Sequence, residues 1–201
     1  MISLFKLLEA GDFSQKVDEL ARPFREKFAL PKIHQLGLVV ENVEESAGEL
    51  EQKGIGPFFL AEGSPVFWRE RGEEKKFQGR MGLAYFQGIE LELLEPGAGS
   101  DFYRQSLVPG EIIIQHLGFL VPEVEGWIEK LEQAGYPLRV RGRLKSGPLI
   151  TDFAYMDTIN DVGLIVEFNS WKFFFWKISP APFARLLARL QKLSGKRCWK
   201  M

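Results

Sequence analysis

Apolar residues recur along this chain with two alternating periods, one typical of strands and one typical of helices. Residues 33–40 and 114–121 are β-branched and apolar, which favours strands. After the first of these segments, Val43, Ala47 and Leu50 fall at i, i+4 and i+7, the spacing of one helix face. The same helical spacing follows the second segment, at Val124, Trp127, Ile128 and Leu131. The pattern therefore predicts a strand followed by a helix, twice.

The two strand–helix segments are copies of one unit. Residues 35–54 align with residues 116–135 without a gap, and nine of the twenty aligned positions are identical. Asn42 opens a capping-box pattern at the start of the first predicted helix. Gly54 and Gly135 lie where a helix ends in a left-handed residue. The chain therefore contains a duplicated supersecondary unit.

Each copy continues into further strands that also correspond. Second strands are expected at Phe58–Leu60 and Leu138–Arg141. In both copies a glycine-containing turn then separates two strands, and a glutamate, Glu92 or Glu167, follows four residues after the glycine. These features predict an α+β protein made of two tandem βαβββ modules, residues 33–96 and 114–170.

The segments outside the modules are predicted to form helical extensions. We expect the main domain to span residues 32–170, with an N-terminal helical extension at 1–31 and an amphipathic C-terminal extension at 171–201. The first extension has a helical pattern over Phe13–Phe28 that breaks before Pro23. The second carries an apolar stripe at Phe183, Leu186, Leu187, Leu190 and Leu193.

The apolar stripe has three conceivable partners. Packing on the chain's own domain or on a partner subunit is favoured over a membrane surface, although a basic amphipathic helix suits all three. A group of aromatic residues is expected to anchor this extension, at Trp171, Phe173, Phe174, Phe175 and Trp176.

The composition narrows the class of protein. The 26 basic and 27 acidic residues nearly cancel, which argues against a nucleic-acid-binding protein. Cys198 is the single cysteine, so an intramolecular disulfide is excluded and a reducing compartment suits the chain. The first ten residues lack the basic start and cleavage site of a signal peptide. The aromatic run 171–178 is too short to cross a bilayer. We therefore expect a cytoplasmic protein.

Strand alternation selects between two candidate ligands in the first strand. Side chains point to opposite faces in turn, and the apolar alternate residues form the face that the helix covers. His34 shares that face, whereas Gln35 points the other way, as does His116 at the matching position of the second copy. The repeat therefore pairs Gln35 with His116 and assigns His34 to a hydrogen bond at the strand end.

Three carboxylates lie on the same kind of face in the middle of strands. Glu90 and Glu92 oppose the apolar residues of one strand, and Glu167 opposes those of another. Burying unpaired carboxylates is costly, and a bound cation offsets that cost. Two interpretations stay open at this point: a cation site, or a sheet face open to water on which the carboxylates are solvated.

Four strand motifs, in this order, resemble the signature strands of the glyoxalase/bleomycin-resistance superfamily, also called vicinal oxygen chelate proteins. The motifs are Gln35–Val40, Glu92–Pro96, His116–Phe119 and Val166–Phe168. Glu92–Pro96 and the helix-like Asp101–Leu107 most resemble methylmalonyl-CoA epimerase and related glyoxalase-like proteins. The resemblance implies a half-open barrel-like mixed sheet with one metal ligand on each of four strands. These ligands fall here on Gln35, Glu92, His116 and Glu167.

The ligand set implies a divalent metal ion, and Zn, Ni, Co, Mn and Mg are all compatible with it. In the superfamily the metal binds oxygens of a carbonyl substrate and stabilises an enediolate, while a carboxylate moves the proton. The resemblance therefore implies a glyoxalase-type lyase, isomerase or epimerase acting on a small carbonyl or thioester substrate. Glu167 is the implied base, with Glu90 as second candidate. It also implies a homodimer.

The chain departs from the family pattern in two strands. Epimerases of this family carry a second glutamate on the third strand, whereas Arg80–Tyr85 contains no acid. Gln35 in place of a histidine argues against an extradiol dioxygenase. The alternative to an enzyme is a non-catalytic small-molecule-binding protein of the bleomycin-resistance type.

Two basic stretches leave room for an anionic substrate. Ala61–Gly79 mixes aromatic and basic residues and is long for a strand connection. It is expected to be either a lid over the sheet or a solvated mobile loop. Arg139–Lys145 is a second basic stretch, for which phosphate or carboxylate recognition is the hypothesis.

Overall fold

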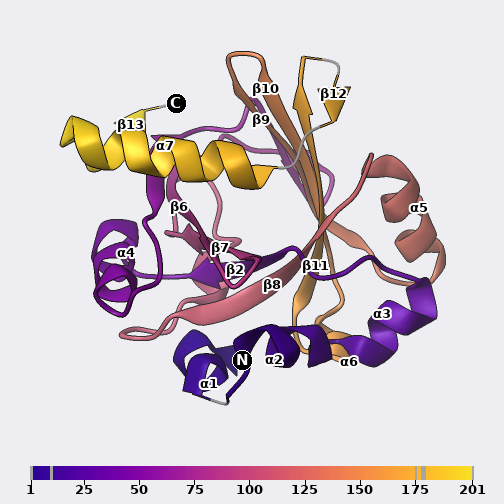
Figure 1. The fold of residues 1–201 in the computed structure, drawn as a ribbon. Coiled ribbons are helices and arrows are strands. Elements are labelled where there is room, and N and C mark those ends of the chain that lie inside the picture. Colours follow the sequence, from indigo (N-terminus) through magenta and orange to yellow (C-terminus); the bar gives the residue numbers. More distant parts are fainter. Residues whose placement is uncertain (1, 10, 175, 178–179, 201) are drawn as a thin grey trace.

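A computed structural model describes residues 2–9, 11–174, 176–177 and 180–200. The two predicted modules are present (Figure 1). The first contains β2 (Gln35–Val39), α4 (Val43–Gln52), β3 (Phe59–Gly63), β6 (Gly79–Phe86) and β7 (Ile89–Leu94). The second contains β8 (Ile113–Leu120), α5 (Glu125–Gln133), β9 (Leu138–Ser146), β10 (Leu149–Met156) and β11 (Ile165–Phe173). The α+β class and the βαβββ repeat are therefore confirmed.

Local signals in the sequence account for the ends of the two module helices. The Asn42 side chain accepts hydrogen bonds from the backbone N–H groups of Glu44 and Glu45, which caps the first turn of α4. Gly54 and Gly135 follow α4 and α5 with φ of 80° and 91°. Such left-handed backbone favours glycine, so both helices end where the sequence predicts.

One mixed sheet joins the two modules at their first strands. Its order is β13-β3-β6-β7-β2-β8-β11-β10-β9-β4-β5, where β4 is Phe67–Glu70, β5 is Glu73–Glu74 and β13 is Trp199–Lys200. At the centre β2 pairs antiparallel with β8, and each of these strands pairs in parallel with the last strand of its own module. The first strands of both modules therefore lie side by side, and the sheet curls around them as a half-open barrel (Figure 1).

The two faces of the sheet have different environments, as strand alternation predicts. Leu36, Leu38 and Val40 belong to the main core, together with the apolar residues of α4 and α5. Val39, between them in sequence, packs instead in a separate aromatic cluster on the opposite face, as does Ile165 of β11. Gln35, which shares the parity of Val39, therefore points to the face that no module helix covers.

Of the two alternatives for the connection Ala61–Gly79, the solvated mobile loop is wrong. The connection is ordered, and its Trp68 and Phe77 form part of the wall of a cavity at the sheet. It contains β4 (Phe67–Glu70) and β5 (Glu73–Glu74), and β4 pairs antiparallel with β9 of the other module. Trp68 is buried there and stacks on Phe77. The buried indole and the hydrogen bonds to β9 hold the segment in place. The basic composition of the connection therefore wrongly suggested a mobile loop.

The N-terminal extension joins the sheet as well as packing on it. β1 (Ile2–Ser3) pairs with β8, and α1 (Leu4–Glu9), α2 (Phe13–Glu19) and α3 (Arg22–Phe28) follow. The break between α2 and α3 falls at residues 20–21, just before the helix that contains Pro23 in its first turn. This agrees with the predicted break before that proline.

The C-terminal extension covers the β3 edge of the sheet. It contains β12 (Trp176–Lys177), α7 (Pro180–Ser194) and β13 (Trp199–Lys200), and β13 pairs in parallel with β3. The Gln191 amide donates to the backbone oxygen of Leu60 and accepts from its N–H, both at 2.7 Å. These bonds satisfy strand groups that an uncovered edge would leave unpaired.

The predicted apolar stripe of α7 is only half buried. Ala184, Ala188 and Gln191 form the side against the sheet, whereas Leu186 and Leu190 are exposed. The small residues allow the helix to lie close to β3 and β6, which displaces the leucines outward. Within the described residues, no helix is long and apolar enough to cross a membrane.

The predicted aromatic anchor is wrong in part. Trp171 and Phe173 are half-buried, whereas Phe174 and Trp176 are exposed. Phe175 lies outside the described residues. Gln191 and β13 hold the extension instead.

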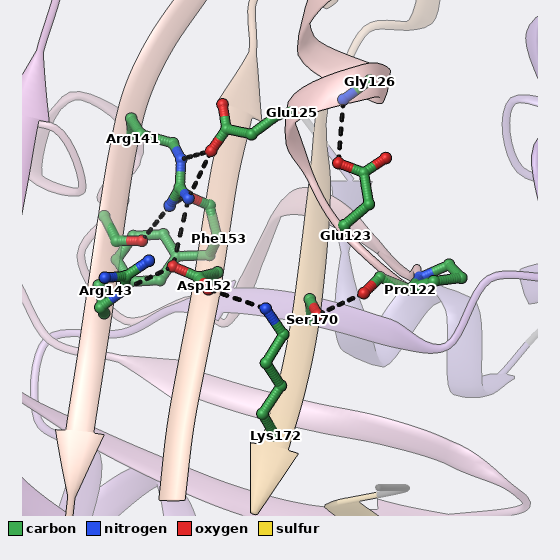
Figure 2. A network of polar contacts seen from close by, with 11 residues as sticks. Pro122, Glu123, Glu125, Gly126, Arg141, Arg143, Asp152, Phe153, Ser170 and Lys172 are labelled. Carbon is green, nitrogen blue, oxygen red and sulfur yellow. Dashed lines mark hydrogen bonds and ion pairs between the residues drawn. The ribbon is translucent and has the colours of Figure 1, made fainter. Parts of the chain in front are cut away.

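Most of the second basic stretch is engaged by acids of the same domain. Figure 2 shows the buried Asp152 carboxylate beside Arg141, Arg143 and Lys172, with Arg141 also bound to Glu125 at the start of α5. The shortest contact joins Arg143 Nε to Asp152 Oδ1 at 2.7 Å. Burial opposes ionisation of Asp152, but hydrogen bonds from the two arginines outweigh it and lower the pKa. These arginines therefore serve the fold.

Replacement of Asp152 by Asn is expected to destabilise the protein by about 2 kcal/mol at neutral pH, because three cations lose their shared carboxylate. Urea unfolding measures the change. The loss should shrink as the pH falls below the ordinary Asp value of 3.8, since a depressed pKa stabilises the fold only while the group is ionised. The matched control Asp18→Asn removes an exposed ion pair with Arg25 and should cost less than about 0.5 kcal/mol. Equal effects of the two substitutions would contradict the buried network.

Candidate metal centre

Three ligand-type side chains converge on the face of the sheet opposite the module helices. Glu92 on β7, His116 on β8 and Glu167 on β11 each place one ligand atom within 4.8 Å of the others. His116 Nε2 lies 3.3 Å from Glu167 Oε2 and 3.5 Å from Glu92 Oε2. The alternative of a water-exposed sheet face is wrong, because all three residues are buried.

Two glycines make room for this arrangement at the junction of the modules. The register between β2 and β8 pairs Gly37 with His116 and Gln35 with Gly118. A Cβ atom on Gly37 would overlap the imidazole of His116, and one on Gly118 would overlap the Gln35 amide. The repeated motif therefore supplies, in each module, a polar side chain and the glycine that accommodates the polar side chain of the other module.

A hydrogen bond and an aromatic contact orient the His116 ring. Nδ1 lies 3.0 Å from Oε1 of Gln115, so Nδ1–H donates to that amide oxygen and Nε2 points to the carboxylates. The Tyr155 ring packs edge-on against the imidazole at 5.0 Å between centroids. The Tyr155 hydroxyl in turn meets the Tyr103 hydroxyl at 3.1 Å. The ring is therefore held in one orientation from both sides.

Gln35, the fourth predicted ligand, is buried beside this group. Its Nε2 donates to Glu90 at 2.8 Å, and its Oε1 accepts from Asn169 Nδ2 at 3.2 Å. The same Asn169 nitrogen lies 3.4 Å from Glu167 Oε2. Gln35 is therefore linked to the carboxylate group through Asn169, and its direct coordination of a metal stays a prediction.

The two histidines occupy distinct places, as strand alternation predicts. His34 lies outside the three-residue group. Its buried Nε2 lies 4.0 Å from Glu90 Oε2 and makes no hydrogen bond among the described residues, so the predicted hydrogen bond of this nitrogen is wrong. Burial lowers the pKa of His34. Glu90 itself accepts hydrogen bonds from Gln35 and from the Tyr85 hydroxyl, and it is fully buried.

The site concentrates negative charge in a buried place. Burial, together with the charges of Glu92 and Glu167, raises the pKa of Glu90 to about 8, although the Tyr85 hydrogen bond acts the other way. Burial likewise raises the pKa of Glu92. Burial alone would lower the pKa of His116, but the neighbouring carboxylates outweigh it and raise the pKa to about 9. Each shift reduces the negative charge of the cluster.

These residues fit a divalent cation. His116 Nε2 and Glu92 Oε2 are buried atoms without a hydrogen-bond partner among the described residues, and they face each other across 3.5 Å. Leaving such atoms unpaired is costly. One imidazole nitrogen and two carboxylates are a ligand set that several first-row divalent metals accept.

The group opens onto a cavity of about 280 Å³. Glu92, Glu167, Gln35 and Asn169 line one part of it, whereas His116 and Glu90 do not reach its surface. Most other lining residues are apolar or aromatic, among them Trp68, Phe77, Leu83, Phe153, Trp171 and Phe183. The cavity therefore combines one polar region with a large apolar wall, the usual composition of a small-molecule site.

Sequence reasoning missed the residues that support the ligands. Tyr85 and Tyr155 occupy corresponding places in the two repeats, and each is the cross-strand partner of an acid, Glu90 or Glu167. That correspondence was a usable signal, because a tyrosine opposite a glutamate on a buried face is placed to contact it. Asn169 shares the face of Glu167, yet its link to Gln35 crosses β8 and depends on strand order and register that no local pattern predicts.

Substitution of Gly37 by Ala is expected to displace the His116 ring and to destabilise the fold by about 1–3 kcal/mol through overpacking. Thermal unfolding and the histidine NMR signals measure the two effects. Gly48→Ala in α4 is the matched control, since a Cβ there meets nothing within 4 Å and alanine favours a helix. A stable Gly37→Ala variant with unshifted His116 signals would contradict the close approach.

Comparisons with known proteins bear on the family. The model of the Glyoxalase/Bleomycin resistance protein/Dioxygenase superfamily matches residues 34–155. No curated protein matches the chain.

Similar solved structures include a hypothetical protein from Bacillus halodurans, at 15% identity and TM-score 0.45, over 69% of this chain and 92% of that one. Methylmalonyl-CoA epimerase from Mycobacterium tuberculosis matches at 13% identity and TM-score 0.46, over 68% of this chain and 85% of that one. A Streptomyces coelicolor methylmalonyl-CoA epimerase variant in complex with 2-nitronate-propionyl-CoA matches at 14% identity and TM-score 0.46, over 70% of this chain and 96% of that one.

The family match covers more than half of the chain, from the residue before β2 to Tyr155 near the end of β10, and so includes β2 and β8, the strands at the junction of the modules. By this match the chain belongs to the glyoxalase/bleomycin resistance/dioxygenase superfamily.

Proposed function

We propose that this protein is a metal-dependent enzyme of glyoxalase type, which moves a proton at the carbon next to a carbonyl or thioester group of a small substrate. The observation that carries the proposal is the convergence of two unpaired buried atoms, His116 Nε2 and Glu92 Oε2, with Glu167 in the wall of a cavity. Superfamily membership supports the general class of chemistry.

Glu92, His116 and Glu167 would hold the divalent ion, with Gln35 as a fourth ligand. When bound, such an ion acts as a Lewis acid on a carbonyl oxygen and so acidifies the neighbouring C–H. Gln115 fixes the imidazole tautomer with Nε2 free to coordinate, which supports His116 as a ligand.

Glu167 is the better candidate for the base. It lines the cavity, so its carboxylate can reach a substrate carbon there. Glu90 is fully buried and does not line the cavity, and both of its oxygens accept hydrogen bonds, from Gln35 and Tyr85. We therefore assign Glu90 to the positioning of Gln35, and Asn169 to the positioning of Glu167.

The cavity also limits the substrate. Its apolar and aromatic walls fit a hydrocarbon or aryl substituent, and Lys145 and Lys200, which also line it, fit an anionic group. The cavity side of β6 presents Met81 and Leu83, so no acid stands there to act as a second base. Without an acid on β6 opposite Glu167, the cavity supports proton removal and return by Glu167 on one face of the substrate, rather than epimerisation by two opposed bases.

Metal binding tests the first half of the proposal. The purified protein should bind one divalent ion, and His116→Ala should weaken binding by more than the roughly 10- to 100-fold that loss of an outer-shell contact costs. Isothermal titration with Zn²⁺, Ni²⁺, Co²⁺ and Mn²⁺ measures this. His34→Ala removes the other histidine of the chain and should leave the affinity unchanged. Absence of binding at micromolar metal would overturn the enzyme proposal.

Proton exchange tests the second half. The metal-loaded protein should catalyse deuterium wash-in next to the carbonyl of apolar α-hydroxycarbonyl compounds or acyl thioesters, followed by NMR in D₂O. Glu167→Gln should slow this exchange by about 100-fold or more, whereas Glu132→Gln, exposed on α5 and outside the cavity, should not. Intact metal binding without exchange across the substrate panel would favour the non-catalytic binding protein instead.

A further inference from the structure

The charges of this chain are strongly segregated along its sequence. Glu167 is the last acidic residue, so residues 1–167 hold all 27 acids of the chain. The segment that follows carries only basic charges, at Lys172, Lys177, Arg185, Arg189, Lys192, Lys196, Arg197 and Lys200. The near-zero net charge of the whole chain therefore conceals a basic C-terminal extension on an acidic body.

This basic segment also exposes large apolar side chains. Leu186, Leu190 and Leu193 fall at i, i+4 and i+7 of α7, on one face of the helix, and are 54%, 45% and 85% exposed. Trp176 on β12 is 73% exposed, and Phe174 beside it is exposed too. Val66 and Ile159 are the other large hydrophobic residues that are exposed in the described part of the chain. Exposed apolar groups thus concentrate in the extension.

The two elements that carry these exposed groups, α7 and β12, lie at the same end of the molecule (Figure 1). Figure 1 shows α7 crossing the same end of the structure at which β12 stands, and only two residues separate the elements. On a helix with 100° per residue, the exposed Arg189 and Lys192 lie along one flank of the leucine row. The opposite flank leads through Leu187 to the face that lines the cavity and contacts β3 and β6.

This α7 surface, defined by Leu186, Leu190, Leu193, Arg189 and Lys192, is poorly suited to a symmetric contact between two copies. A two-fold interface places the same patch on both sides. Cations of one copy would then face cations of the other, and the extension offers no acid to pair them. An anionic bilayer supplies both missing partners, since it presents phosphate charges above an apolar interior.

We propose that the α7 surface, with Trp176, docks on anionic lipid membranes. The leucine row enters the interface between headgroups and acyl chains, while Arg189 and Lys192 contact lipid phosphates. Trp176 inserts at headgroup level, where tryptophan is enriched. The inner face of α7 stays on the sheet through Gln191, so docking leaves the fold intact.

Vesicle flotation with the full chain tests the proposal. The protein should float with phosphatidylcholine vesicles containing phosphatidylglycerol and not with pure phosphatidylcholine, and added salt should weaken binding. The double variant Arg189→Glu/Lys192→Glu should bind about thirtyfold less tightly or worse, since each cation near an anionic leaflet contributes about a factor of five. Leu190→Ser/Leu193→Ser should also lose binding, and Trp176 fluorescence should shift to the blue on anionic vesicles.

Matched substitutions outside the surface serve as controls. Lys32→Glu reverses an exposed cation elsewhere, and Val66→Ser removes an exposed apolar side chain elsewhere; both should bind as the wild type does. Failure of the wild type to float with anionic vesicles at low salt would overturn the proposal. Binding that survives the leucine substitutions would do the same. So would a wild-type dimer that the leucine substitutions convert to monomer, because the surface would then be a subunit contact. None of these outcomes depends on metal binding or proton exchange.

Discussion

The antiparallel pairing of β2 with β8 is the constraint on which the site depends. It places the first strands of two duplicated units against each other, so that a ligand-type side chain of one lies over a glycine of the other. The last strand of each module runs beside its own first strand and adds Glu92 or Glu167. A duplicated motif thereby produces one site with contributions from both halves. Because Gln35 and His116 are separate residues of one chain, they have diverged in type while keeping equivalent positions.

Burial sets the chemistry of this junction. Three carboxylates and one imidazole share a space from which water is largely excluded, and the metal-free protein reduces the resulting repulsion by raising the pKa of Glu90 and of His116. A divalent ion would do this more effectively, since it would stabilise the ionised carboxylates and replace the proton on His116 Nε2. Gln35 apart, the surrounding amides and tyrosines would then act as supports that hold the charged groups in place.

Much of the fold was predictable from the sequence, and so was the core of the candidate site. Strand alternation correctly predicted that His34 lies outside the ligand group and that Gln35 lies beside it. Alternate residues of β2 pack on opposite faces of the sheet, and only one of these faces carries the group. The internal repeat placed Glu92 and Glu167 on one pair of equivalent strands, and Gln35 and His116 on another pair, before any contact was known. What the sequence did not predict depends on strand order and register: the Asn169 link between Gln35 and Glu167 across β8, and the pairing of β4 with β9. On α7, Ala184 and Ala188 lie on the buried side and three leucines are exposed, because small residues allow the helix to approach the sheet more closely than leucines would.

The pairing of β4 with β9 has a kinetic consequence. β4 pairs with β9 at the edge of the second module, but in sequence it lies between β3 and β6 of the first module. Nearly the whole sheet must therefore assemble before either module is complete. Contacts between residues so distant in sequence form slowly, because the long intervening chain loses conformational entropy before the β4–β9 hydrogen bonds form. The two modules are therefore not expected to fold independently of each other. Synthesis of the first module alone would expose an unpaired aromatic hairpin, and the nascent chain reaches its native sheet only after β9 has been made.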